Sequence, residues 1–64
     1  MMIPLNSSAI SAVGWDGYHL FVQFHTSDTI YTFYGVPYSI FAGLVQADSP
    51  GTFYHRHIAG RYRG

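Results

Sequence analysis

The chain contains no cysteine, no lysine and no glutamate, and charged residues make up only 9% of its 64 positions. Without cysteine, no disulfide can support the fold, and a reducing compartment such as the cytosol suits the chain. No apolar run approaches the roughly 20 residues of a membrane-spanning helix, and no signal segment is recognisable. We therefore expect a water-soluble, cytoplasmic protein.

The low content of charged residues favours assembly of several copies of the chain. The chain, residues 1–64, forms one domain at most, and a chain of this size buries only about 60% of the surface that its unfolded form exposes. An average domain carries about 25% charged residues, whereas here aromatic residues, at 19%, outnumber charged ones. We expect part of this aromatic surplus to lie in a subunit interface or a ligand pocket, which predicts a homo-oligomer.

The fixed positive charges are concentrated near the end of the sequence. They belong to Arg56, Arg61 and Arg63, whereas the aspartates are spread through the first three quarters of the chain. The planar guanidinium group binds phosphate or carboxylate through two hydrogen bonds and stacks on aromatic rings. Long nucleic acids require many neutralised phosphates, so these arginines favour a short anionic ligand such as a mononucleotide.

Three segments show patterns typical of β-strands, at residues 11–15, 18–25 and 30–34. Between the first two, Asp16-Gly17 is a strong signal for a two-residue hairpin turn. The period of two in the second segment predicts one face made of Tyr18, Leu20, Val22 and Phe24, and an opposite face made of His19, Phe21, Gln23 and His25. Residues 1–6 have no period and are interpreted as an arm or an irregular first strand. We predict a three-stranded antiparallel meander.

A change of period from position 38 predicts two helices. Pro37 suits the start of the first one, because its missing N–H would have no partner there, and helical spacing continues as far as Asp48. Ser49 as N-cap and Pro50 at the first position begin the second helix, with one stripe made of Tyr54, Ile58 and Tyr62. The predicted fold is α+β, in the order β-β-β-α-α, with both helices on the face that carries Leu20, Val22, Phe24, Tyr31 and Phe33.

The order of residues along the chain resembles the KTSC domain. The resemblance covers residues 8–62 and rests on Leu20-x-Val22-x-Phe24, Tyr31-x-Phe33, Val36-Pro37, Leu44-x-x-Ala47-x-Ser49-x-Gly51-x-Phe53-Tyr54 and Ile58-x-x-x-Tyr62. Two positions depart from the family pattern: Phe33 stands in place of a tyrosine, and His55 in place of a common asparagine. KTSC domains occur at the C-terminus of some lysyl-tRNA synthetases and as free-standing bacterial and phage proteins. The resemblance implies a binding module without chemistry of its own, for which the synthetase context suggests RNA binding.

The second helix supplies the candidate ligand-binding residues. Its first turn exposes backbone N–H groups beside Ser49, Gly51 and Thr52, a typical place for an anion. Further along lie Tyr54, Arg56, His57, Arg61 and Tyr62, which offer stacking and phosphate contacts. An ordinary cap and a solvated helix end whose cations meet the helix dipole remain the alternatives. On one helix, Arg56 and Arg61 would stand about 140° apart, so a second subunit would have to help hold a small anion.

The outer face of the sheet is the candidate oligomer interface. Phe21, Ile30 and Tyr34 make it too apolar to face only water. Scattered surface aromatics are the alternative.

Catalysis and metal binding are not expected. His55 and His57 diverge on a helix, and His19 and His25 lie roughly 20 Å apart on a strand. No nucleophile elbow and no base held by an orienting acid is recognisable. We expect a non-enzymatic binder with no cofactor and no metal, which holds or sequesters a small anionic ligand such as a nucleotide. Phage-encoded sponges for nucleotide signals of bacterial defence act in this way, and RNA binding or a purely structural, protein-interaction role are the alternatives.

Overall fold

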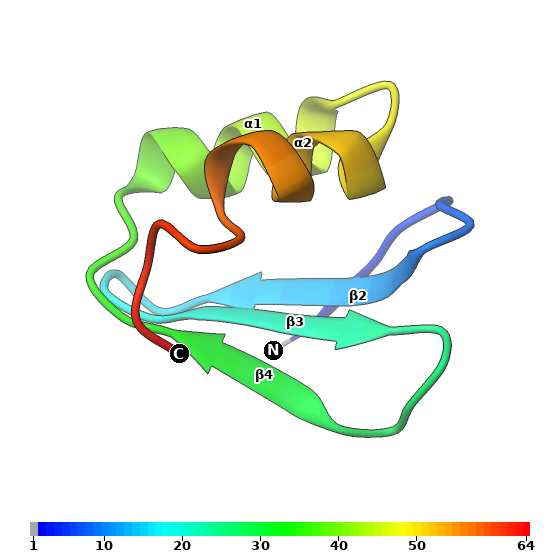
Figure 1. Ribbon diagram of the computed structural model, residues 1–64, viewed down its shortest axis with the longest axis horizontal. Coiled ribbons are helices and arrows are strands. Elements are labelled where there is room, and N and C mark those ends of the chain that lie inside the picture. The colour runs from blue at the N-terminus through cyan, green and yellow to red at the C-terminus, as the bar shows by residue number, and fades with distance from the viewer. Residues whose placement is uncertain (1) are drawn as a thin grey trace.

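A computed structural model describes residues 2–64 as an antiparallel sheet with two helices packed on one of its faces (Figure 1). The strands follow the order β1-β2-β3-β4 across the sheet. The elements are β1 (Ile3–Pro4), β2 (Ile10–Trp15), β3 (Leu20–Phe24), β4 (Ile30–Phe33), α1 (Tyr38–Gln46) and α2 (Pro50–His57). The α+β class, the meander and the two helices that follow it are confirmed.

The sheet has four strands rather than the predicted three. The additional strand, β1, pairs Ile3 with Val13 and Pro4 with Ala12, and the N–H of Leu5 donates to the carbonyl of Ser11 at 3.0 Å. Two exposed residues are too few to display an alternating pattern. The edge position also explains why proline is tolerated, because there its missing N–H breaks no ladder.

The predicted register of the central strands is correct. Val22 lies opposite Val13 on β2, and Leu20 lies opposite Trp15 on β2 and Phe33 on β4. Directly opposed residues project to the same face of a sheet. Leu20, Val22 and Phe33 are all buried beneath the helices, as expected.

Tyr18 does not belong to the buried face. It precedes β3 and leaves 54% of its surface exposed. The hairpin turn causes the difference: Gly17 has a φ of +103°, which glycine adopts readily, and the N–H of Asp16 donates to the carbonyl of His19. The alternating pattern therefore begins two residues later than the sequence indicated.

The core lies between the sheet and the helix pair. It consists of Ile10, Val13, Leu20, Val22 and Phe33 from the strands, Val36 from the link before α1, Leu44 from α1, and Ile58 directly after α2. Neither helix is long and apolar enough to cross a membrane within the part of the chain that is described.

The second helix is shorter than predicted. It ends at His57, where the N–H groups of Ile58 and Ala59 both donate to the carbonyl of Tyr54. Gly60 then adopts a φ of +72°, a conformation in which glycines commonly terminate helices. Tyr62 is consequently not part of a helical stripe. Beyond it the chain returns to the sheet, where the N–H of Tyr34 donates to the carbonyl of Arg63 at 2.7 Å.

Candidate functional site

The first turn of α2 is closed by its own residues. The Ser49 hydroxyl accepts from the N–H of Thr52 at 3.4 Å and donates to the Thr52 hydroxyl at 2.9 Å. Ser49 is therefore the predicted N-cap, with Pro50 at the start of the helix. Gly51 packs closely on the segment before β2, since a Cβ at this position would lie 3.1 Å from the Cβ of Ala9. These contacts correspond to the alternative of an ordinary helix cap, with Gly51 allowing close packing of the helix on its neighbour.

The predicted angular separation of Arg56 and Arg61 is wrong. Arg61 lies beyond the helix, and its Nε donates to the carbonyl of Arg56 at 2.8 Å. The turn at Gly60 thus brings the Arg61 guanidinium to the C-terminal end of α2, where a cation meets the negative end of the helix dipole. Arg56, Arg61 and Arg63 are all exposed. The Arg61 side chain therefore lies beside the backbone of Arg56 at this end of the helix.

The aromatic members of the predicted ligand site face the interior. Tyr54 packs edge-on against Phe24 and Phe33, with ring centroids 5.2 and 5.8 Å apart. Burial raises the pKa of the Tyr54 phenol, and the nearby Tyr31 adds to the effect. Tyr62 is partly buried against the core.

The ligand residues predicted on α2 thus divide into two groups. Ser49, Gly51 and Thr52 lie at its first turn, whereas Arg56, His57 and Arg61 lie at its last turn or just beyond it. An eight-residue helix is about 12 Å long, so the two groups are separated by roughly that distance. No pocket joins them, or occurs elsewhere, within residues 2–64 of a single chain.

The predicted interface residues share the outer face of the sheet. Phe21 lies opposite Gly14 and Thr32, and Ile30 lies opposite Gln23. Both helices are on the other face (Figure 1), so no element formed by residues 2–64 covers this one. Ile30 is 48% exposed and Tyr34 is 47% exposed. The strand positions of this outer face carry no charge and comprise Pro4, Ala12, Gly14, Phe21, Gln23, Ile30 and Thr32.

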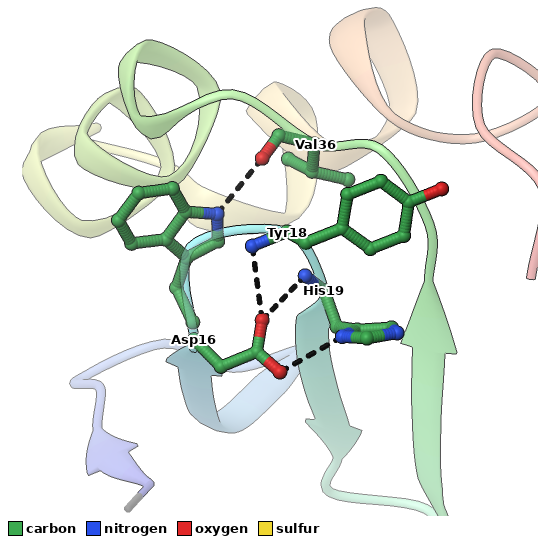
Figure 2. Close-up of polar contacts among 5 residues, drawn as sticks. Asp16, Tyr18, His19 and Val36 are labelled. Carbon is green, nitrogen blue, oxygen red and sulfur yellow. Dashed lines mark hydrogen bonds and ion pairs between the residues drawn. The ribbon is translucent and has the colours of Figure 1, made fainter.

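The structure contains an acid and a base that the sequence analysis did not connect. The Asp16 carboxylate accepts through Oδ1 from the N–H groups of Tyr18 and His19, at 2.9 and 2.6 Å, and its Oδ2 lies 2.8 Å from Nδ1 of the His19 ring (Figure 2). These contacts, led by the two backbone N–H groups, lower the pKa of Asp16 to about 2. His19 is therefore an imidazole held by an orienting carboxylate, which corrects the expectation that no such pair exists.

His19 is also surrounded by aromatic rings. Its ring stacks on Phe21 at an interplanar angle of 25°, with centroids 6.1 Å apart. Tyr18 and Tyr34 meet it edge-on, at 4.8 and 5.1 Å. We call Tyr18, His19, Phe21 and Tyr34 the aromatic cluster. An aspartate three residues before a histidine across a predicted Asp-Gly turn was the signal that could have revealed it.

A second set of contacts fixes the aromatic cluster to the helix layer. The indole Nε1 of Trp15 donates to the carbonyl of Val36 at 2.8 Å (Figure 2), and the N–H of Val36 donates to the carbonyl of Tyr18 at 2.9 Å. The link between β4 and α1 is therefore tied to both sides of the hairpin. The Tyr18 and His19 rings consequently sit on a rigid support rather than on a free loop.

Comparison with known proteins agrees with this architecture. The KTSC domain family model matches residues 6–62, so the chain belongs to the KTSC domain family. A protein from Tsukamurella paurometabola is 35% identical over 63 residues, which span 97% of this chain and 94% of that protein. The crystal structure of a KTSC domain protein from Yersinia pestis superposes with a TM-score of 0.91 at 29% identity, covering 98% of this chain and 90% of that one.

Proposed function

We propose that this KTSC domain protein is a non-catalytic binding module of the cytoplasm that assembles from identical copies and holds a small anionic ligand, foremost a nucleotide. The observation that carries the proposal is the uncharged, uncovered outer face of the sheet, with Phe21 and Ile30 on it and Tyr34 at its end. Apolar surface of this kind favours association. Because the chain carries no net charge, identical copies do not repel one another strongly.

Because residues 2–64 of one chain form no pocket, the proposed ligand site requires a wall from a second subunit. Small-ligand sites are normally concave and bury most of the ligand. Arg61, whose Nε is bound to the carbonyl of Arg56, and the exposed Arg56 on the last turn of α2 offer planar donors for a phosphate. Because the helices lie on the other side of the sheet from the outer face (Figure 1), a neighbouring copy in the assembly would have to reach the end of α2 to supply the opposite wall. A binder of this kind suits the sequestration of a nucleotide signal, as in phage-encoded inhibitors of bacterial defence.

Titration calorimetry with a panel of nucleoside monophosphates and inorganic phosphate tests this function. Replacing Arg56 or Arg61 by lysine keeps the charge but removes the planar fork, so we expect weaker nucleotide binding. Replacement by glutamate should abolish binding. Binding that is the same in the native protein and in all of these variants would contradict a role for the arginines.

RNA binding is the second candidate, favoured by the open sheet face with the partly exposed Phe21 on a central strand and the 47% exposed Tyr34 at its end, since exposed aromatics on a sheet can stack bases. The two functions differ in their response to salt. A mononucleotide should show a shallow salt dependence, whereas RNA should show a steep one that grows with the number of phosphate contacts. If neither a nucleotide nor a short single-stranded RNA binds, a protein-interaction role would be favoured instead.

A further inference from the structure

We propose that His19, held by Asp16 within the aromatic cluster, accepts a hydrogen bond from the amino group of a nucleobase, and that the base stacks on the exposed rings of Tyr18 and Tyr34. This inference rests on the proposed nucleotide-binding function, to which it adds a place for the base at the end of the outer face. Tyr34 stands both at this place and at the end of the proposed interface, so a base bound there would lie at the border between two copies.

The position of the hydrogen on the His19 imidazole follows from the charge of Asp16. With a pKa of about 2, the Asp16 carboxylate is ionised at neutral pH and can only accept hydrogen bonds. Its Oδ2 lies 2.8 Å from His19 Nδ1, so Nδ1 must carry the hydrogen. In a neutral imidazole the other nitrogen, Nε2, then keeps its lone pair and is an acceptor.

The second step concerns the surroundings of that acceptor. Nδ1 of the His19 ring has a hydrogen-bond partner, whereas Nε2 has none within residues 2–64. The side chain of His19 is 34% exposed. The carboxylate, the Phe21 ring beneath and the Tyr34 edge together fix the imidazole. The cluster thus offers a preorganised acceptor at the surface, which calls for a donor on the ligand.

The third step concerns the shape of the ligand. Tyr18 and Tyr34 are both about half exposed, at 54% and 47%, and their rings stand at 86° to each other. Exposed tyrosines are suitable stacking surfaces for nucleobases, whichever base is present. A flat ring that bears an amino group can therefore stack and donate to Nε2 at once, which the amino-bearing bases adenine, cytosine and guanine allow.

The fourth step links this cluster to the cationic end of the chain. The N–H of Tyr34 donates to the carbonyl of Arg63 at 2.7 Å, so the segment that carries an arginine runs beside the aromatic cluster. Arg63 is exposed, and in this proposal its guanidinium would bind the phosphate of a nucleotide whose base is held at His19. The base can belong to a free nucleotide or to single-stranded nucleic acid, because the cluster would contact the same ring in both.

The test compares ligands and variants in matched pairs. We expect calorimetry to give adenosine monophosphate an affinity about two- to tenfold higher than the same nucleotide with its amino group dimethylated, since the dimethylated base keeps its stacking surface but has no N–H to donate. An adenine-containing oligonucleotide and its dimethylated form make a second arm, which separates the two sources of the base.

Asp16→Asn tests the positioning role of the carboxylate. The asparagine oxygen can keep the turn, while its amide N–H₂ faces Nδ1 and moves the ring hydrogen to Nε2, so the preference for the unmodified base should disappear. Asp28→Asn removes the same charge from another turn and should leave the preference intact. Nitrogen-15 spectra of the imidazole provide a readout that needs no ligand: Nδ1 should be protonated in the native protein and Nε2 in Asp16→Asn.

Each outcome has a definite meaning. If nucleotides bind but the two adenine ligands bind equally, or if Asp16→Asn keeps the preference, the role of His19 is overturned while the proposed function stands. The same holds if Nε2 carries the hydrogen in the native protein. If neither nucleotides nor oligonucleotides bind, the proposed function itself fails, and this inference fails with it.

Discussion

The Phe53 ring on α2 occupies the space in which a side chain at Gly43 on α1 would begin. A Cβ placed on Gly43 would lie 2.8 Å from Cε2 of Phe53, closer than carbon atoms approach without displacing one another. The absence of a side chain at this position therefore sets how closely the two helices pack.

We predict that Gly43→Ala destabilises the protein by about 1–3 kcal/mol through overpacking, although alanine is the better helix former by roughly 1 kcal/mol. Thermal or denaturant unfolding measures the change. Combining it with Phe53→Leu should recover part of the loss, because the shorter side chain vacates the space. A stabilised Gly43→Ala would mean that the helices are farther apart than described.

The sheet register gives a second prediction. Phe33 is buried under the helices, so Phe33→Ala should cost about 3–5 kcal/mol, which is comparable to the whole stability of a small domain. Thr32→Ala, one residue away on the outer face, should cost much less. Denaturant melts that rank the two variants in the reverse order would place the opposite face of β4 in the core.

These two predictions differ in how far the sequence alone supports them. The burial of Val22 follows from alternation, which the five residues of β3 display clearly. Phe33 lies on the four-residue β4, which alternates less clearly, and it shares the buried face because it lies opposite Leu20. The contact between Gly43 and Phe53 depends on the distance between two helices, about which periodicity says nothing.

The candidate sites show the same limit: contacts between residues close in sequence are predictable, whereas those that depend on the path of the backbone or on a distant partner are not. The N-cap at Ser49 was readable from local pattern, because a cap involves residues three apart. The end of α2 was misplaced, because the pattern of apolar residues continues through Ile58 to Tyr62 although the backbone turns at Gly60. Residues 1–6 were interpreted as an arm or an irregular first strand, and the sequence could not decide between the two because the evidence for β1 lies in its pairing with β2.

The pH dependence of stability should report on Asp16. Its pKa is lowered from 3.8 to about 2 in the folded protein, so the stabilisation is fully present above about pH 4 and is lost as the pH falls through 2. Asp16→Asn, which does not titrate, should therefore lose less stability than the native protein over this range. Melting temperatures of both proteins between pH 5 and 2 measure the difference, and parallel curves would contradict the proposed hydrogen bonds to the carboxylate.

The outer face can be tested separately. Phe21 lies on the central strand β3 with Gly14 and Thr32 beside it, so Phe21→Asp would place a charge in the middle of the proposed interface. We expect a shift toward monomer in sedimentation velocity and a lower melting temperature. Thr32→Asp, at the neighbouring position of the same face, should act in the same direction. If the native protein is a well-folded monomer at micromolar concentration, the composite ligand site is excluded.

Native mass spectrometry of the protein purified from its own host is the most direct test of the central claim, that this KTSC domain protein is an oligomeric binder of a small anionic ligand. It reports the number of subunits and any retained small molecule in one spectrum. We expect an assembly of several copies that carries additional mass matching a nucleotide, lost on mild activation. A ligand-free monomer as the dominant species would contradict it.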